Sequence, residues 1–251
     1  MTDNRELFTA KAEDYARFRP SYPAAAVDWL RERSSGGAVA DIGAGTGIFT
    51  RLLLRRFAPV YAVEPNAAMR AVFRRFLPGI PCFDGSGECT GLPGGAVELI
   101  TVAQAFHWLD EALFKVEARR ILRPNGKVAI IWNSCVPNEF TLARDEVCKK
   151  YCPRFRAGHA GKRSAAEGDA FLREVYFSKA EVASFDNPFV MELTAFLGNM
   201  RSRSYALAPG DPGLAGFEAE LRDVFDRFSE NGVVTEPQRT EIYLGCFDRS
   251  A

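Results

Sequence analysis

The chain has 251 residues, a length that fits one α/β domain or one domain with a large insertion. Its hydrophobic share of 47% and charged share of 25% are typical of a globular protein and argue against global disorder. The 32 Lys and Arg residues balance the 32 Asp and Glu residues, so no net positive charge favours a nucleic acid or an anionic membrane as a partner.

Targeting and redox features give further expectations. The first six residues, MTDNRE, are not followed by an apolar run, so no secretory signal is expected. No stretch approaches the ~20 apolar residues that cross a bilayer, so no membrane partner is expected. The six cysteines have no CxxC spacing and the chain has only two histidines, so we expect no metal site and reduced thiols in a cytoplasmic protein.

The first 133 residues alternate between helical and strand patterns. The predicted elements, in order, are a helix over 22–33, a buried strand over 38–42, a helix over 48–57, a strand over 60–63, a helix over 67–76 capped by Asn66, strands over 80–83 and 97–103, a helix over 111–122, a turn over 123–126 and a strand over 127–132. Strands and helices at this spacing predict a mostly parallel sheet that is covered on both faces.

The alternation ends at Asn133. Residues 134–179 are predicted to be mostly helical, with a Gly-, Ala-, Lys- and Arg-rich segment over 157–168 that could be a mobile loop. Strand character over 182–193 precedes a helix over 194–205, capped by Thr194, and a helix over 217–228. The chain ends in a strand over 240–247, and no internal repeat or second domain is visible.

A glycine-rich turn, the segment 41–47 (DIGAGTG), follows the first buried strand. Glycines between a strand and a helix bring backbone amides close to a ligand, because a Cβ would block the approach or forbid the dihedral angles. A phosphate-binding loop would need GxxxxGK followed by Ser or Thr, which is absent. The dinucleotide pattern GxGxxG needs a third glycine where this chain has Ile48, which argues against a dinucleotide.

The segment 39–47 (VADIGAGTG) resembles motif I of the class I S-adenosylmethionine-dependent methyltransferases. The resemblance implies S-adenosylmethionine as the cofactor, held at the turn by Asp41, Gly43, Ala44 and Gly45. It also implies an acidic residue at the end of the next strand that accepts hydrogen bonds from both ribose hydroxyls. Glu64, followed by Pro65, stands at that place.

This family implies a Rossmann-like, doubly wound α/β fold, mostly parallel with an antiparallel last strand, plus helical cap segments. We expect one methyltransferase domain over 1–251. Its core would comprise about 34–133, 180–193 and 238–248, with an N-terminal lid over 7–33 and cap insertions over 134–179 and 194–237. Residues 7–20 and 194–205 are predicted to close over opposite sides of the methyl-transfer centre.

Three further segments resemble the family, and the last two of them resemble its type 11-like, small-molecule branch. The segment 84–88 (DGSGE), with Leu92-Pro93 behind it, resembles the stretch that passes the adenine, which would place Ser86 and Gly87 at the cofactor. The segment 104–108 (QAFHW) resembles a sequence of the branch that contains trans-aconitate methyltransferase, and adds Gln104. The segment 11–23 resembles an arm over the methionine end, where Tyr15 and Arg19 would contact the carboxylate or merely pack.

Methyl transfer requires that the acceptor is aligned with the methyl group and that water is excluded. A general base is needed only when the acceptor must lose a proton. His107 is the candidate base or acceptor contact, or else it supports the loop of Trp108. Trp108 would line the methyl-transfer site or pack in the core. Arg203 and Tyr205 would contact the acceptor, an anion being a suitable partner for arginine, or lie on a solvated face.

The predicted activity is therefore methyl transfer to a small-molecule acceptor. Two alternatives remain open: a cofactor-binding regulator or inactive homologue, and a nucleotide-dependent oxidoreductase. The acceptor, the methylated element and the oligomeric state are not indicated by the sequence.

Overall fold

The computed structural model describes residues 9–157, 159–160, 163–177 and 179–247. Residues 7, 8, 158, 161, 162, 178 and 248 of the predicted segments lie outside the described residues. The helices are α1 (Ala12–Phe18), α2 (Ala24–Glu32), α3 (Thr50–Leu53), α4 (Ala67–Phe76), α5 (Glu111–Ile121), α6 (Glu139–Tyr151), α7 (Ala165–Phe171), α8 (Leu193–Arg201) and α9 (Leu214–Phe228). The strands are β1 (Val39–Ile42), β2 (Val60–Val63), β3 (Cys82–Phe83), β4 (Val97–Ala103), β5 (Leu122–Cys135), β6 (His159–Ala160), β7 (Arg163–Ser164), β8 (Lys179–Asp186), β9 (Phe189–Glu192), β10 (Val233–Glu236) and β11 (Gln238–Cys246).

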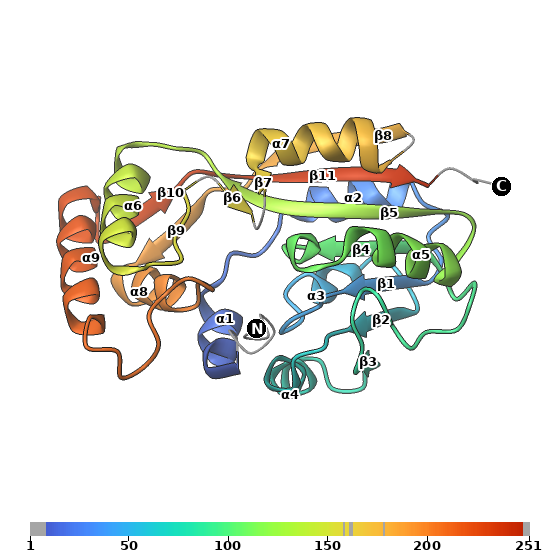
Figure 1. The fold of residues 1–251 in the computed structure, drawn as a ribbon, viewed down its shortest axis with the longest axis horizontal. Helices are drawn as coiled ribbons and strands as arrows, with labels where there is room; N and C mark the ends of the chain where they lie inside the picture. Colours follow the sequence, from blue (N-terminus) through green and yellow to red (C-terminus); the bar gives the residue numbers. More distant parts are fainter. Residues whose placement is uncertain (1–8, 158, 161–162, 178, 248–251) are drawn as a thin grey trace.

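Within the described residues the main sheet has seven strands in the order β3-β2-β1-β4-β5-β11-β8. The first five strands are parallel, and β11 lies antiparallel between β5 and β8 (Figure 1). The register pairs Asp41 of β1 with Ala62 of β2 and with Thr101 of β4, so the carboxyl ends of these strands lie together. The predicted Rossmann-like fold, with its antiparallel last strand, is confirmed.

Apolar residues alternate along the strands and supply a core on each face of the sheet. Ala40 and Ile42 of β1 face a core that α5 closes with Phe114 and Ile121. Val39 faces the opposite core, which α2 and α3 complete. A strand that is buried on both faces reads as a continuous apolar run, which is why β1 was recognisable in the sequence.

A second body, the cap, stands beside the sheet. It consists of α6, α8, α9 and the hairpin of β9 and β10, packed around Phe196 and Phe217. The long strands β5 and β11 run from the sheet to the cap (Figure 1). Residues 180–193 were predicted to belong to the core sheet. For 189–192 this is wrong, because β9 pairs with β10 in the cap. No helix in the described ranges is long and apolar enough to span a bilayer.

Three local predictions were wrong. The helix expected over 48–57 is α-helical only over α3, and tight turns complete the segment. The turn expected over 123–126 lies within β5, as an irregularity in its pairing with β4 at which Asn125 has φ +67°. Thr194 does not cap α8, because β9 continues directly into that helix and Glu192 takes the cap position without a side-chain hydrogen bond.

The N-terminal helix α1 joins the sheet to the cap. It packs on α4 through Ala12 and Met69 and, on its other side, lies along α8 (Figure 1). The Phe18 ring lies so close to Gly198 that a Cβ there would be 2.2 Å from it. The N-terminal segment and 194–205 therefore pack on each other, and the prediction that they stand on opposite sides is wrong. Ion pairs support both contacts, because Glu13 of α1 pairs with Arg75 of α4 and Asp14 pairs with Arg201 of α8.

Candidate functional site

The glycine turn at the carboxyl end of β1 contains three glycines with positive φ: Gly43 at +67°, Gly45 at +58° and Gly47 at +87°. A Cβ on Gly43 would lie 2.5 Å from the Cβ of Ala105, and one on Gly47 would lie 2.7 Å from Leu77. At Gly45 the nearest atom is Cε1 of Tyr15, at 3.9 Å. Two of the glycines are thus required by packing, whereas Gly45 opens onto free space.

Asp41 lies beneath this turn and is 1% exposed. Its carboxylate accepts hydrogen bonds from Oγ1 of Thr50 at 2.6 Å and from Oγ1 of Thr101 at 2.8 Å. Burial raises the pKa of Asp41 to about 6, and the two hydroxyl donors oppose that rise. The residue also lines the smaller of the two pockets described below.

The raised pKa of Asp41 predicts a specific pH dependence of stability. A carboxyl whose pKa is higher in the folded state contributes stability below its unfolded pKa, and that contribution is lost as the pH rises through about 6. Between pH 4 and 7 the free energy of unfolding of the wild type should therefore fall by about 2 kcal/mol relative to Asp41→Asn. Urea titrations of both proteins measure this difference, and a difference independent of pH would contradict the prediction.

Glu64 ends β2 on the other side of the turn and is 7% exposed. One carboxylate oxygen accepts the backbone amide of Gly45 at 2.9 Å, and the other accepts that of Asn66 at 2.8 Å. Asn66 in turn caps α4 by accepting from the amide of Met69, as predicted. Glu64 therefore ties the glycine turn to the start of α4.

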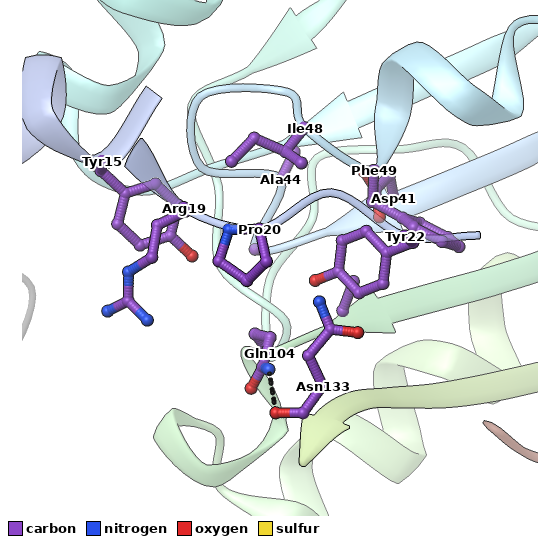
Figure 2. Close-up of a pocket in the computed structure, with 12 residues that line it drawn as sticks. Tyr15, Arg19, Pro20, Tyr22, Asp41, Ala44, Ile48, Phe49, Gln104 and Asn133 are labelled. Atoms are coloured by element: carbon purple, nitrogen blue, oxygen red, sulfur yellow. Dashed lines mark hydrogen bonds between the residues drawn. The ribbon is translucent and has the colours of Figure 1, made fainter. Parts of the chain in front are cut away.

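Two pockets meet at the glycine turn. The larger has a volume of about 290 Å³ and is lined by Glu64, Pro65, Asn66, Met69, Ser86, Gly87, Glu88, Ala105, Trp108 and Leu109, among others. The smaller is lined by Arg19, Pro20, Tyr22, Asp41, Ala44, Ile48, Phe49 and Asn133 (Figure 2). Both are lined by Tyr15, Gly43, Ala103 and Gln104, so these residues stand at the boundary between the two pockets.

Gln104, one of the residues that line both pockets, has a strained backbone conformation. It is a non-glycine residue at φ +56°, and its side-chain Nε2 donates to the backbone oxygen of Asn133 at 3.0 Å (Figure 2). Such backbone conformations cluster at functional sites, because the surroundings must hold them in place. Asn133, which the sequence analysis did not select, also donates to the backbone oxygen of Ser21. Its position near the carboxyl end of a predicted parallel strand was the available signal.

Tyr15 and Arg19 reach the pockets from the N-terminal segment. Figure 2 shows the hydroxyl of Tyr15 directed toward the pocket, whereas the guanidinium of Arg19 points away from Asp41 and Tyr22. That guanidinium lies 4.9 Å from the ring centre of Tyr15, and its Nη2 donates to the backbone oxygen of Ser202 at 3.3 Å. Burial, and then the nearby Arg203, lower the pKa of Arg19 to about 10.

His107 and Trp108 follow β4 in a short 3-10 helix (Phe106–Trp108). The His107 ring centre lies 4.5 Å from that of Trp108 and 5.3 Å from that of Trp132. Burial, and then the Arg19 cation, lower the pKa of His107 to about 4, so the ring is neutral at pH 7. Its buried Nδ1 has no hydrogen-bond partner among the described residues. Trp108 lines the larger pocket and is 38% exposed, whereas His107 lines neither pocket.

Arg203 and Tyr205 stand further from the glycine turn and line neither pocket. The Arg203 guanidinium donates to Oδ1 of Asn199 and lies 3.7 Å from the Glu236 carboxylate. The Tyr205 ring packs edge-on against Phe155, with ring centres 4.9 Å apart. The structure thus gathers most of the predicted residues around the turn, and it leaves these two in the neighbouring cap.

Comparison with known proteins points to one family. Residues 40–130 match the family model described as a methyltransferase domain. An uncharacterized methyltransferase of Schizosaccharomyces pombe is 32% identical over 190 residues, which cover 72% of this chain and 74% of that protein. One of Mycobacterium tuberculosis is 42% identical over 120 residues, 48% of this chain and 49% of that protein, so the chain spans about half the length of this relative.

A solved structure from Anaeromyxobacter dehalogenans, which carries the provisional name of a type II methyltransferase, is similar over nearly the whole fold. It is 27% identical, covers 91% of this chain and 97% of its own, and superimposes with a TM-score of 0.67. The similarity therefore extends through the cap, which the family model does not reach.

Proposed function

Because this chain belongs to the class I S-adenosylmethionine-dependent methyltransferases, we propose that it transfers the methyl group of S-adenosylmethionine to a small molecule by in-line displacement. The observation that carries the proposal is the open side of Gly45, which lines the larger pocket directly beside the buried carboxylate of Glu64. A positive-φ glycine with free space where its Cβ would stand is a cradle for a ligand that approaches the backbone.

The pocket residues fit the parts of this cofactor. Glu64 would accept both ribose hydroxyls through charge-assisted hydrogen bonds. Ser86 and Gly87, which also line the larger pocket, would contact the adenine. The smaller pocket would hold the methionine portion, with the Tyr15 hydroxyl toward its carboxylate. A volume of about 290 Å³ is at the lower end of the usual range for ligand pockets, and the joined smaller pocket extends it.

The cofactor supplies a methyl group on a cationic sulfonium, and the protein's residues supply position. Holding the two reactants in line contributes about 7–11 kcal/mol in favourable cases. The aromatic face of Trp108 would stabilise positive charge near it by roughly 0.5–2 kcal/mol. His107, with a pKa of about 4, is neutral at pH 7 and lines neither pocket, so it would support the loop of Trp108 and would not act as the base.

Two measurements test the function. Calorimetry with S-adenosylmethionine and S-adenosylhomocysteine should give binding in a one-to-one ratio, and NADH should not bind. Methyl-labelled cofactor incubated with pools of small acids, amines and alcohols should then label one pool. Binding without any labelling would favour a regulator or inactive homologue, and binding of NADH alone would favour an oxidoreductase.

A further inference from the structure

A pair of arginines stands where the N-terminal segment meets the last turn of α8. Arg19 donates to the backbone oxygen of Ser202, and Arg203 follows Ser202 directly in the chain. Arg203 is held by Oδ1 of Asn199, which accepts from its Nε at 3.3 Å and from its Nη2 at 3.0 Å. Asn199 also donates to the backbone oxygen of Phe18, so the same residue fixes both chain segments. The two guanidiniums are therefore held in place near each other.

The carboxylates of this region do not balance its cations. Glu236, 1% exposed, pairs with Arg144 as well as with Arg203. Arg19 has no carboxylate partner among the described residues, and its Nε is buried without an acceptor. Lys11, 8% exposed, donates to the backbone oxygens of Arg203 and Ala206 and to no acid in the described chain.

Like charges held together in a partly buried place are unfavourable unless an anion joins them. Burial lowers the pKa of Arg19, and repulsion by the Arg203 cation lowers it further. Guanidinium groups in such a pair offer planar donors that match an oxyanion. The Nε of Arg19 is such a donor, and it has no acceptor among the described residues.

We propose that Arg19 and Arg203 hold an oxyanion of the methyl acceptor, so that the acceptor is a small carboxylic acid or phosphate ester. This inference rests on the proposed function. Arg19 lines the smaller pocket but turns its guanidinium away from Asp41 and Tyr22 (Figure 2). That guanidinium donates to the backbone oxygen of Ser202, the residue next to Arg203, at the end of the cap helix α8. An anion between them would lie at the border of the cofactor pocket and the cap. A carboxylate acceptor also needs no strong base, which suits a neutral His107.

The test uses the full chain saturated with S-adenosylhomocysteine and titrated with succinate, with inorganic phosphate and with neutral succinamide. Succinate or phosphate should bind and succinamide should not. Arg203→Gln should weaken binding of the anion at least tenfold, with the affinity for S-adenosylhomocysteine unchanged within twofold. The matched control is Arg201→Gln on the same helix, which removes a half-exposed arginine paired with Asp14 and Glu218 and should leave both affinities unchanged.

Three outcomes would overturn the inference: neither anion binds the wild type, Arg203→Gln leaves anion binding unchanged, or Arg203→Gln weakens S-adenosylhomocysteine as strongly as the anion. The last outcome would assign the pair to the methionine carboxylate of the cofactor. If Arg203→Gln does not fold, Arg203→Lys keeps the charge beside Glu236 and should still lose anion affinity through the lost planar donor group. Failure of S-adenosylhomocysteine to bind the wild type would contradict the proposed function itself.

Discussion

Gly45→Val is expected to abolish binding of S-adenosylmethionine while the protein still folds. Gly45 has φ +58°, so a branched side chain adds strain of about 1–2 kcal/mol to the turn. Its Cβ would meet nothing closer than Tyr15 at 3.9 Å and would point into the space proposed for the cofactor. Calorimetry with S-adenosylhomocysteine should show no heat of binding, and circular dichroism should show an intact fold.

The matched control for that substitution is Gly232→Val. Gly232 has φ +78°, and no atom lies within 4 Å of the position of its Cβ. The substitution brings the same kind of backbone strain at a turn outside both pockets, so stability should fall and affinity should not. Wild-type affinity in Gly45→Val would mean that the glycine turn has a structural role only.

Glu64→Ala should weaken cofactor binding by about 1.5–3 kcal/mol, a loss of roughly 10- to 150-fold in affinity. Two ribose hydroxyls would lose one charged acceptor. The same change removes the partner of the Gly45 and Asn66 amides, so we expect a folded protein that is about 1–3 kcal/mol less stable. Calorimetry measures the first effect and urea unfolding the second.

Glu98→Ala separates these two effects. The Glu98 carboxylate also accepts a backbone amide, that of Gly37, but near the start of β4 and away from both pockets. Its loss should reduce stability without changing the affinity for S-adenosylhomocysteine. An unchanged affinity in folded Glu64→Ala would remove Glu64 from the cofactor site.

The sequence alone was sufficient where a short local pattern carries the structure. The run 41–47 predicted a strand, a turn and a close ligand approach, because glycine adopts the three positive φ values seen there without steric cost. The cap of α4 by Asn66 was predictable for the same reason, since donor and acceptor are three residues apart. Alternation of buried runs and amphipathic helices indicated the parallel sheet, which the structure confirms.

Contacts between distant parts of the chain were decided only by the tertiary structure. Local pattern could not reveal that α1 lies along α8. Lys11, just before α1, donates to the backbone oxygen of Ala206, after α8, and this hydrogen bond forms only when the two distant segments pack together. Local pattern also missed β10, a strand that needs β9 for its hydrogen bonds. The neutral state of His107 depends on burial and on Arg19, and the unbalanced pair of Arg19 and Arg203 depends on Asn199. Hydrogen bonds, burial and charge pairing act through space, so these features arise only when the folded chain brings their partners together.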